Sequence, residues 1–169
     1  MPQRPLCTRF FCLLATLAIL VATDPAMAAA PTWRWPTSSG AAGLIRAFQP
    51  PLHQYGAGHR GVDLEATDGQ QITAPASGVV LFKGLVARIP TLVLDHVGGL
   101  RSTYQPVATA LKVGEMVETG AAIGVIAKGG RHCQPRTCLH FGVRNSAGYL
   151  DPVKMIRQNS PVLLPLLHY

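Results

Sequence analysis

Residues 138–144 read Cys-Leu-His-Phe-Gly-Val-Arg, and this stretch is the clearest indication of the fold class. Apolar side chains stand at positions 139, 141 and 143, so an extended strand would bury them on one face and present His140 on the other. The pattern therefore predicts a half-buried β-strand. A histidine on the polar face is either a ligand for a bound group or an ordinary surface residue, and this strand alone leaves both interpretations open.

Strand-length apolar segments separated by Gly and Asp turns also precede this stretch. They are rich in β-branched residues and span residues 71–74, 78–82, 91–95, 102–104 and 122–127. Such spacing is typical of all-β proteins. The middle of the chain has no capped amphipathic helix, and only residues 151–158 favour a short one. We therefore expect an all-β fold, a compact antiparallel β-sheet domain.

The first 28 residues have the features of a secretory signal peptide. Arg4 and Arg9 precede an apolar run at residues 10–22, and Ala26-Met27-Ala28 supplies the small residues that a signal peptidase needs. The apolar run is short for a membrane span. We expect cleavage after Ala28, no membrane span in the mature chain, and a secreted, extracytoplasmic location in the cell wall or periplasm.

Beyond the signal peptide we expect a lead-in linker, one domain and a short tail. Residues 29–45, rich in Pro, Ser, Gly and Ala, form the predicted linker, residues 46–155 the domain and residues 156–169 the C-terminal tail. Trp33 and Trp35 would point the same way from a strand, because they are two residues apart. They favour packing onto the edge of the domain, and a sugar-stacking face is the alternative.

The charge of the chain bears on its partners. Fifteen Lys and Arg residues stand against eight Asp and Glu, a formal net charge of +7. The basic residues are scattered without interleaved aromatics, a pattern that argues against nucleic acid as a partner. A positive surface suits an anionic cell wall, although a soluble basic surface without a special partner explains the charge equally well. We expect a monomer.

Two cysteines remain after signal cleavage. Cys7 and Cys12 leave with the signal peptide, whereas Cys133 and Cys138 stay in the mature chain. An even pair of cysteines in an exported protein predicts a disulfide, here across the short turn Gln-Pro-Arg-Thr.

A second motif, Gly-His-Arg-Gly-Val-Asp-Leu at residues 58–64, suggests metal binding. His59 and Asp63 are four residues apart and would share one face of the segment. Combined with His140 they make two neutral imidazoles and one carboxylate, the three-ligand set of a catalytic zinc site with one position left open. Zinc in such a set lowers the pKa of a bound water to about 7 and polarises a carbonyl.

These motifs, together with residues 74–80, 101–104 and 113–120, resemble the LytM/lysostaphin-type zinc metallopeptidases in order and spacing. The resemblance covers residues 46–153. It implies a β-rich fold with a groove, one zinc ion, and cleavage of peptides of the bacterial cell-wall peptidoglycan. Transferred to this chain, the metal ligands are His59, Asp63 and His140.

The chain departs from this family at two positions. Active members carry a His-x-His strand and a Tyr-x-His segment, and here Cys138 and Pro106 replace the additional histidines. His132 is the candidate substitute catalytic residue, with a loop histidine as the alternative, and His96 is a weaker candidate. A free Cys138 thiolate could instead complete a closed, four-ligand structural zinc site, although an exported chain with a partner cysteine favours the disulfide.

The resulting functional hypothesis is a secreted zinc metalloendopeptidase-like protein that acts on peptidoglycan peptides. The alternative is a catalytically weak or inactive relative that serves as a cell-wall-binding or regulatory module. A third interpretation is an extracytoplasmic β domain without metal.

Overall fold

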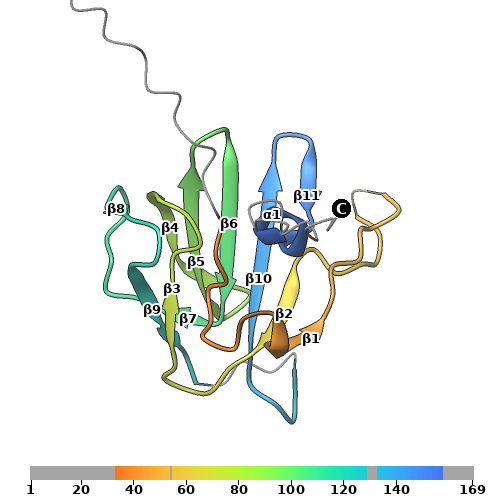
Figure 1. Ribbon diagram of the computed structural model, residues 1–169, viewed down its shortest axis with the longest axis horizontal. Coiled ribbons are helices and arrows are strands. Elements are labelled where there is room, and N and C mark those ends of the chain that lie inside the picture. Colours follow the sequence, from red (N-terminus) through yellow and green to blue (C-terminus); the bar gives the residue numbers. More distant parts are fainter. Residues whose placement is uncertain (1–32, 54, 129–132, 158–169) are drawn as a thin grey trace, which may run out of the picture.

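The computed structural model describes residues 33–53, 55–128 and 133–157. Eleven strands, one 3₁₀ turn and one short helix lie in these ranges (Figure 1). In chain order they are η1 (Gly40–Gly43), β1 (Leu44–Arg46), β2 (Val62–Glu65), β3 (Gln71–Thr73), β4 (Gly78–Val86), β5 (Ile89–His96), β6 (Leu100–Gln105), β7 (Val107–Ala108), β8 (Met116–Val117), β9 (Ala122–Ile126), β10 (Cys138–Asn145), β11 (Gly148–Leu150) and α1 (Pro152–Arg157).

The strands form two antiparallel sheets. The larger sheet has the order β1-β2-β10-β6-β5-β4-β8, with β11 paired to β10, and the smaller has the order β3-β9-β7. The predicted all-β antiparallel fold is therefore confirmed, and each predicted segment overlaps a strand. Strand β4 runs on to Val86 and joins β5 through Ala87 and Arg88, both with positive φ. Neither residue is a glycine, so the sequence carried no signal for this turn.

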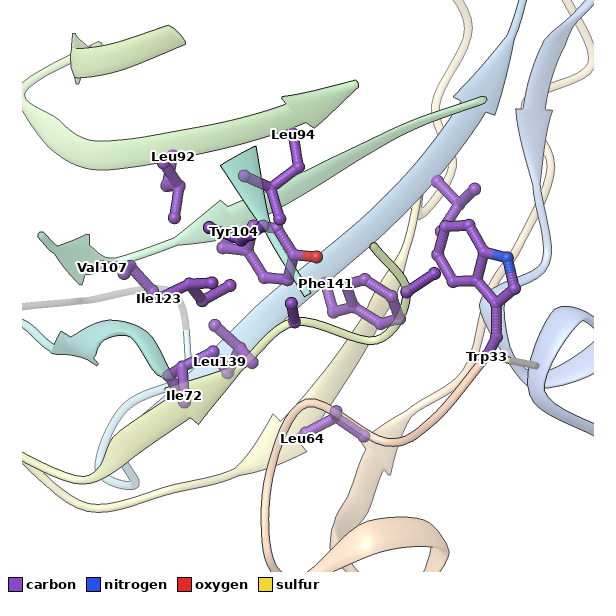
Figure 2. Close-up of a cluster of buried hydrophobic side chains, with 14 of the residues drawn as sticks. Trp33, Leu64, Ile72, Leu92, Leu94, Tyr104, Val107, Ile123, Leu139 and Phe141 are labelled. Carbon is purple, nitrogen blue, oxygen red and sulfur yellow. The ribbon is translucent and has the colours of Figure 1, made fainter. Parts of the chain in front are cut away.

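The hydrophobic core lies between the two sheets (Figure 2). Ile72 and Ile123 of the small sheet face Leu92, Tyr104 and Phe141 of the large one, and all five are at most 1% exposed. The rings of Tyr104 and Phe141 stack with their centroids 5.5 Å apart. This packing explains the alternation in residues 138–144, because the apolar face of β10 covers the small sheet.

The segment that precedes β1 packs on the domain. Trp33 is 4% exposed and lies at one end of the core, its ring centroid 4.9 Å from that of His96 (Figure 2). Backbone hydrogen bonds from Arg34 to Pro75 and from Thr73 to Pro36 fasten the segment along β3. Trp33 is thus a core residue and offers no face for sugar stacking.

The predicted signal peptide and most of the predicted tail lie outside the described residues, and the predicted domain boundaries remain predictions. Within the described ranges, no helix has the length and apolar character needed to cross a membrane.

Strand β10 is central to the site, because it pairs with β2 on one side and β6 on the other. The Cα partners of His140 are Asp63 on β2 and Gln105 on β6.

Candidate metal centre

Strand pairing brings the three predicted ligands together. Asp63 on β2 and His140 on β10 are directly opposite each other, and His59 lies four residues before Asp63. His59 is positioned by a two-way backbone bridge to Gln49, with N···O distances of 2.8 and 3.0 Å. The ligand atoms of the three side chains all lie within 4.8 Å of one another.

The three atoms form a nearly regular triangle. His59 Nε2 lies 3.1 Å from Asp63 Oδ1 and 3.1 Å from His140 Nδ1, and the third edge, His140 Nδ1 to Asp63 Oδ1, is 2.9 Å. Ligand atoms bound tetrahedrally at 2.0–2.1 Å lie about 3.3 Å from one another. The size of the triangle therefore approaches that of a zinc site.

The hydrogen bond made by the other ring nitrogen of His59, Nδ1, indicates whether the three ligand atoms suit a bound cation. His59 Nδ1 donates to the carbonyl oxygen of Ala47 at 2.8 Å, so Nε2 of the neutral ring carries a lone pair. That lone pair faces the carboxylate of Asp63, and both residues are buried, with 6% and 2% exposed. In this tautomer the two acceptors repel each other, and a positive charge between them, a bound cation or a second ring proton, would remove the repulsion. The donor set therefore fits a divalent cation, and the carbonyl of Ala47 orients the ring.

One of the three candidate ligands, His140, borders a cavity. The His140 side chain is 19% exposed and lines a cavity of about 250 Å³ together with Arg60, Thr103 and Gln105. A substrate or water in this cavity would lie beside His140, whereas His59 and Asp63 do not line it.

Cys133 and Cys138 form a disulfide with a Cα–Cα distance of 6.0 Å. Their sulfur atoms lie within 4.8 Å of a carboxylate oxygen of Asp63, so the disulfide borders the candidate centre. In this structure Cys138 is bonded to Cys133 and is no thiolate ligand. His132, the predicted substitute catalytic residue, lies outside the described residues and remains a prediction.

The weaker catalytic candidate, His96, lies in a separate buried cluster. It is 5% exposed, its Nδ1 donates to the Ser77 carbonyl at 2.9 Å, and its Nε2 lies 2.6 Å from Ser102 Oγ. Burial lowers the pKa of His96, and the Ser77 carbonyl and the Asp95 charge only partly oppose that shift. None of these contacts involves the triangle, so His96 has a structural place in the fold.

Pro106, at the second altered position, follows β6 directly. Its carbonyl accepts a hydrogen bond from Ala127 N at 3.1 Å, and it has no side-chain donor to offer a substrate. The adjacent Gln105 lines the cavity with His140, and its Nε2 donates to Thr91 Oγ1 at 2.7 Å.

The sequence analysis did not predict Gln105, Arg60, Arg144 or Tyr149 as residues of the site. Only Arg144 carried a usable signal, because strand alternation puts it on the face of His140.

The chain is similar to several proteins with known sequences. The chain is 36% identical over 160 residues to the uncharacterized protein Rv2891 of Mycobacterium tuberculosis, covering 89% of this chain and 64% of that protein. It is 29% identical over 109 residues to the DD-carboxypeptidase/endopeptidase Mpg of Neisseria meningitidis, covering 64% of this chain and 25% of Mpg. It is 27% identical over 130 residues to the murein hydrolase activator NlpD of Escherichia coli, covering 75% of this chain and 32% of NlpD.

Solved structures show the same fold. The catalytic domain of lysostaphin from Staphylococcus simulans matches with a TM-score of 0.56 and 25% identity, over 66% of this chain and 89% of that domain. A zinc-containing peptidase from Vibrio cholerae matches with a TM-score of 0.60 and 22% identity, over 74% of this chain and 40% of that protein. The sequence profile of peptidase family M23 matches residues 57–152, which include the candidate centre. The chain therefore belongs to peptidase family M23.

Proposed function

We propose that this protein is a secreted zinc metalloendopeptidase that acts on peptide bonds of bacterial cell-wall peptidoglycan. The observation that carries the proposal is the triangle of His59, Asp63 and His140, in which the lone pair of His59 faces a buried carboxylate. The family membership and the likeness to Mpg, whose name describes peptidase activity, support the same function.

His59, Asp63 and His140 would hold the zinc ion. When bound, zinc supplies a Lewis acid and an activated water nucleophile. The chain itself contributes orientation and charge. Ala47 holds the His59 ring, Asp63 supplies the negative charge, and Gln105 presents an amide to a peptide in the cavity beside His140.

Turnover is expected to be slow. General acid–base assistance is worth roughly 10²- to 10⁴-fold and an oxyanion donor roughly 10²- to 10³-fold, and the positions that supply both in active relatives hold Cys138 and Pro106. The two losses need not multiply, because groups that act as a unit are not additive.

These two replacements also favour a second candidate function, a zinc-binding regulatory or cell-wall-binding module without hydrolysis. The likeness to NlpD, named as a murein hydrolase activator, supports it. The disulfide makes a general base at position 138 impossible, because both sulfur atoms are bonded to each other.

Zinc content and release of peptidoglycan fragments, measured on the same preparation, test the proposal. We expect about one zinc per chain and slow release, with both lost in Asp63→Asn and after chelation. The matched control is Asp95→Asn, which removes an exposed carboxylate bonded to Arg101 and should change neither quantity. Zinc well below one equivalent contradicts the metal centre. One equivalent of zinc without any release favours the regulatory module.

A further inference from the structure

A groove beside the candidate centre follows the polar face of β10. His140, Gly142 and Arg144 alternate onto this face. A Cβ at Gly142 would lie 3.0 Å from the carbonyl oxygen of Arg60 and 3.7 Å from His140 Nε2. The missing side chain therefore keeps the floor of the 250 Å³ cavity open between His140 and Arg144.

Two arginines and one tyrosine form the far end of this groove. Tyr149 on β11 is the Cα partner of Arg144, and the guanidinium carbons of Arg60 and Arg144 lie 5.5 and 5.7 Å from its ring centroid. Arg60 also donates to the carbonyl of Gly56 at 3.1 Å. Contact with the ring holds both guanidinium groups in place before any ligand arrives, which lowers the entropy lost on binding.

The groove is positively charged and continues outward. A second cavity of about 800 Å³ shares Arg60, Arg144 and Tyr149 with the first and extends to His53 and Tyr55. Among the described residues that line the two cavities, none is Asp or Glu. Since guanidinium groups match carboxylates in a bidentate geometry, a carboxylate suits this place better than a neutral group.

From these observations we propose that Arg60 and Arg144 bind a free carboxylate of an acidic peptide whose backbone extends toward His140. The four residue steps from His140 to Arg144 span about 13 Å of strand, so the carboxylate lies within about four peptide residues of the candidate centre. Stem peptides of peptidoglycan carry such carboxylates and neutral cross-bridges do not, so the site selects stem peptides. The proposal rests on the proposed function of the same site and identifies its substrate class.

Binding of two labelled peptides to the purified exported protein tests the proposal. One is a stem pentapeptide with free carboxylates, and the other is the same peptide with every carboxylate amidated. Fluorescence anisotropy gives the Kd of each for the wild type, Arg144→Gln, Arg60→Gln and the control Arg34→Gln, which removes the same charge outside both cavities. Zinc content is recorded for each variant, because Arg60 is adjacent to His59.

We expect the wild type to bind the free peptide at least about tenfold more tightly than the amidated one, the effect of one charge-assisted interaction. Arg144→Gln and Arg60→Gln should each remove most of that preference, and Arg34→Gln should keep it. Equal affinities for the two peptides in the wild type, no measurable binding of either, or a loss in Arg34→Gln as large as in Arg144→Gln would overturn the proposal.

Hydrolysis assayed in parallel separates this proposal from the proposed function. Carboxylate-dependent binding without hydrolysis supports the peptide site and contradicts the endopeptidase. Hydrolysis of both peptides at equal rates with equal affinities supports the endopeptidase and overturns the selection for acidic stem peptides.

Discussion

Two buried histidines of this protein make the same kind of contact through Nδ1 and different contacts through Nε2. His59 and His96 are both buried, and each donates its Nδ1 proton to a backbone carbonyl, at 2.8 Å for Ala47 and 2.9 Å for Ser77. The Nε2 atom of His96 meets the hydroxyl of Ser102, which can donate to it. The Nε2 atom of His59 meets a carboxylate oxygen, which cannot.

The difference teaches how to distinguish a ligand histidine from a structural one. In the His96 cluster, Ser102 Oγ also lies 2.7 Å from the hydroxyl of Tyr104, so every polar atom of the chain of hydrogen bonds has a partner. In the His59 cluster two imidazole nitrogens and a carboxylate oxygen converge on one point, and a bound cation would satisfy all three of them at once. Burial alone, which the two clusters share, does not separate these roles.

The difference between the two histidine clusters is tested most directly by replacing each histidine and measuring the zinc affinity. His59→Ala should weaken zinc binding by more than about a hundredfold, because losing a ligand exceeds the 10- to 100-fold effect of losing a supporting partner. His96→Asn should leave it within about twofold. Competition with a fluorescent chelator gives both values, and equal losses would show that the two clusters are not distinct.

Ser102→Ala should destabilise the fold by about 1–3 kcal/mol, because it leaves His96 and the hydroxyl of Tyr104 buried without their partner. Urea unfolding measures this change, and zinc affinity should stay at the wild-type value. Ser146→Ala, on an exposed turn, is the matched control. Adding Tyr104→Phe should recover part of the loss, and a double variant less stable than Ser102→Ala would contradict the hydrogen-bonded chain.

The disulfide borders the candidate metal centre. Replacing both Cys133 and Cys138 with Ser should cost about 2 kcal/mol on the loop-entropy estimate for so short a loop. Thiol titration of a denatured, unreduced protein that comprises residues 29–169 should find no free thiol, and two free thiols would rule out the disulfide. A rise in zinc affinity when the wild type is reduced would instead favour Cys138 as a fourth ligand.

The pH dependence of the free energy of unfolding should report the protonation of His96. Burial lowers its pKa in the folded state below the ordinary value of 6.5, so the unfolded chain takes up a proton first as the pH falls. This contribution to stability is complete above about pH 6.5 and decreases as the pH falls toward the lowered pKa of the folded state. Urea unfolding of zinc-free protein across this window should show the decrease, and His96→Gln should flatten it. An unchanged slope in that variant would assign the effect to other groups.

Local patterns explain how much of this molecule was predictable. The alternation in residues 138–144 predicted β10, because the two-residue period of a strand can be recognised from consecutive residues. Spacing and the family resemblance predicted the set of His59, Asp63 and His140, since two of its members lie in one short motif. The sequence therefore determined the all-β class and the chemistry of the candidate ligands.

Only the tertiary structure decided the surroundings of those ligands. Arg60 and Arg144 are far apart in the sequence and meet at Tyr149 because β2, β10 and β11 are neighbours in one sheet. The hydrogen bond of His96 to Ser102 crosses the β5–β6 pair, and the burial of Trp33 depends on packing against both His96 and Phe141. Such contacts follow from strand pairing between distant segments, and no local period of the sequence encodes them.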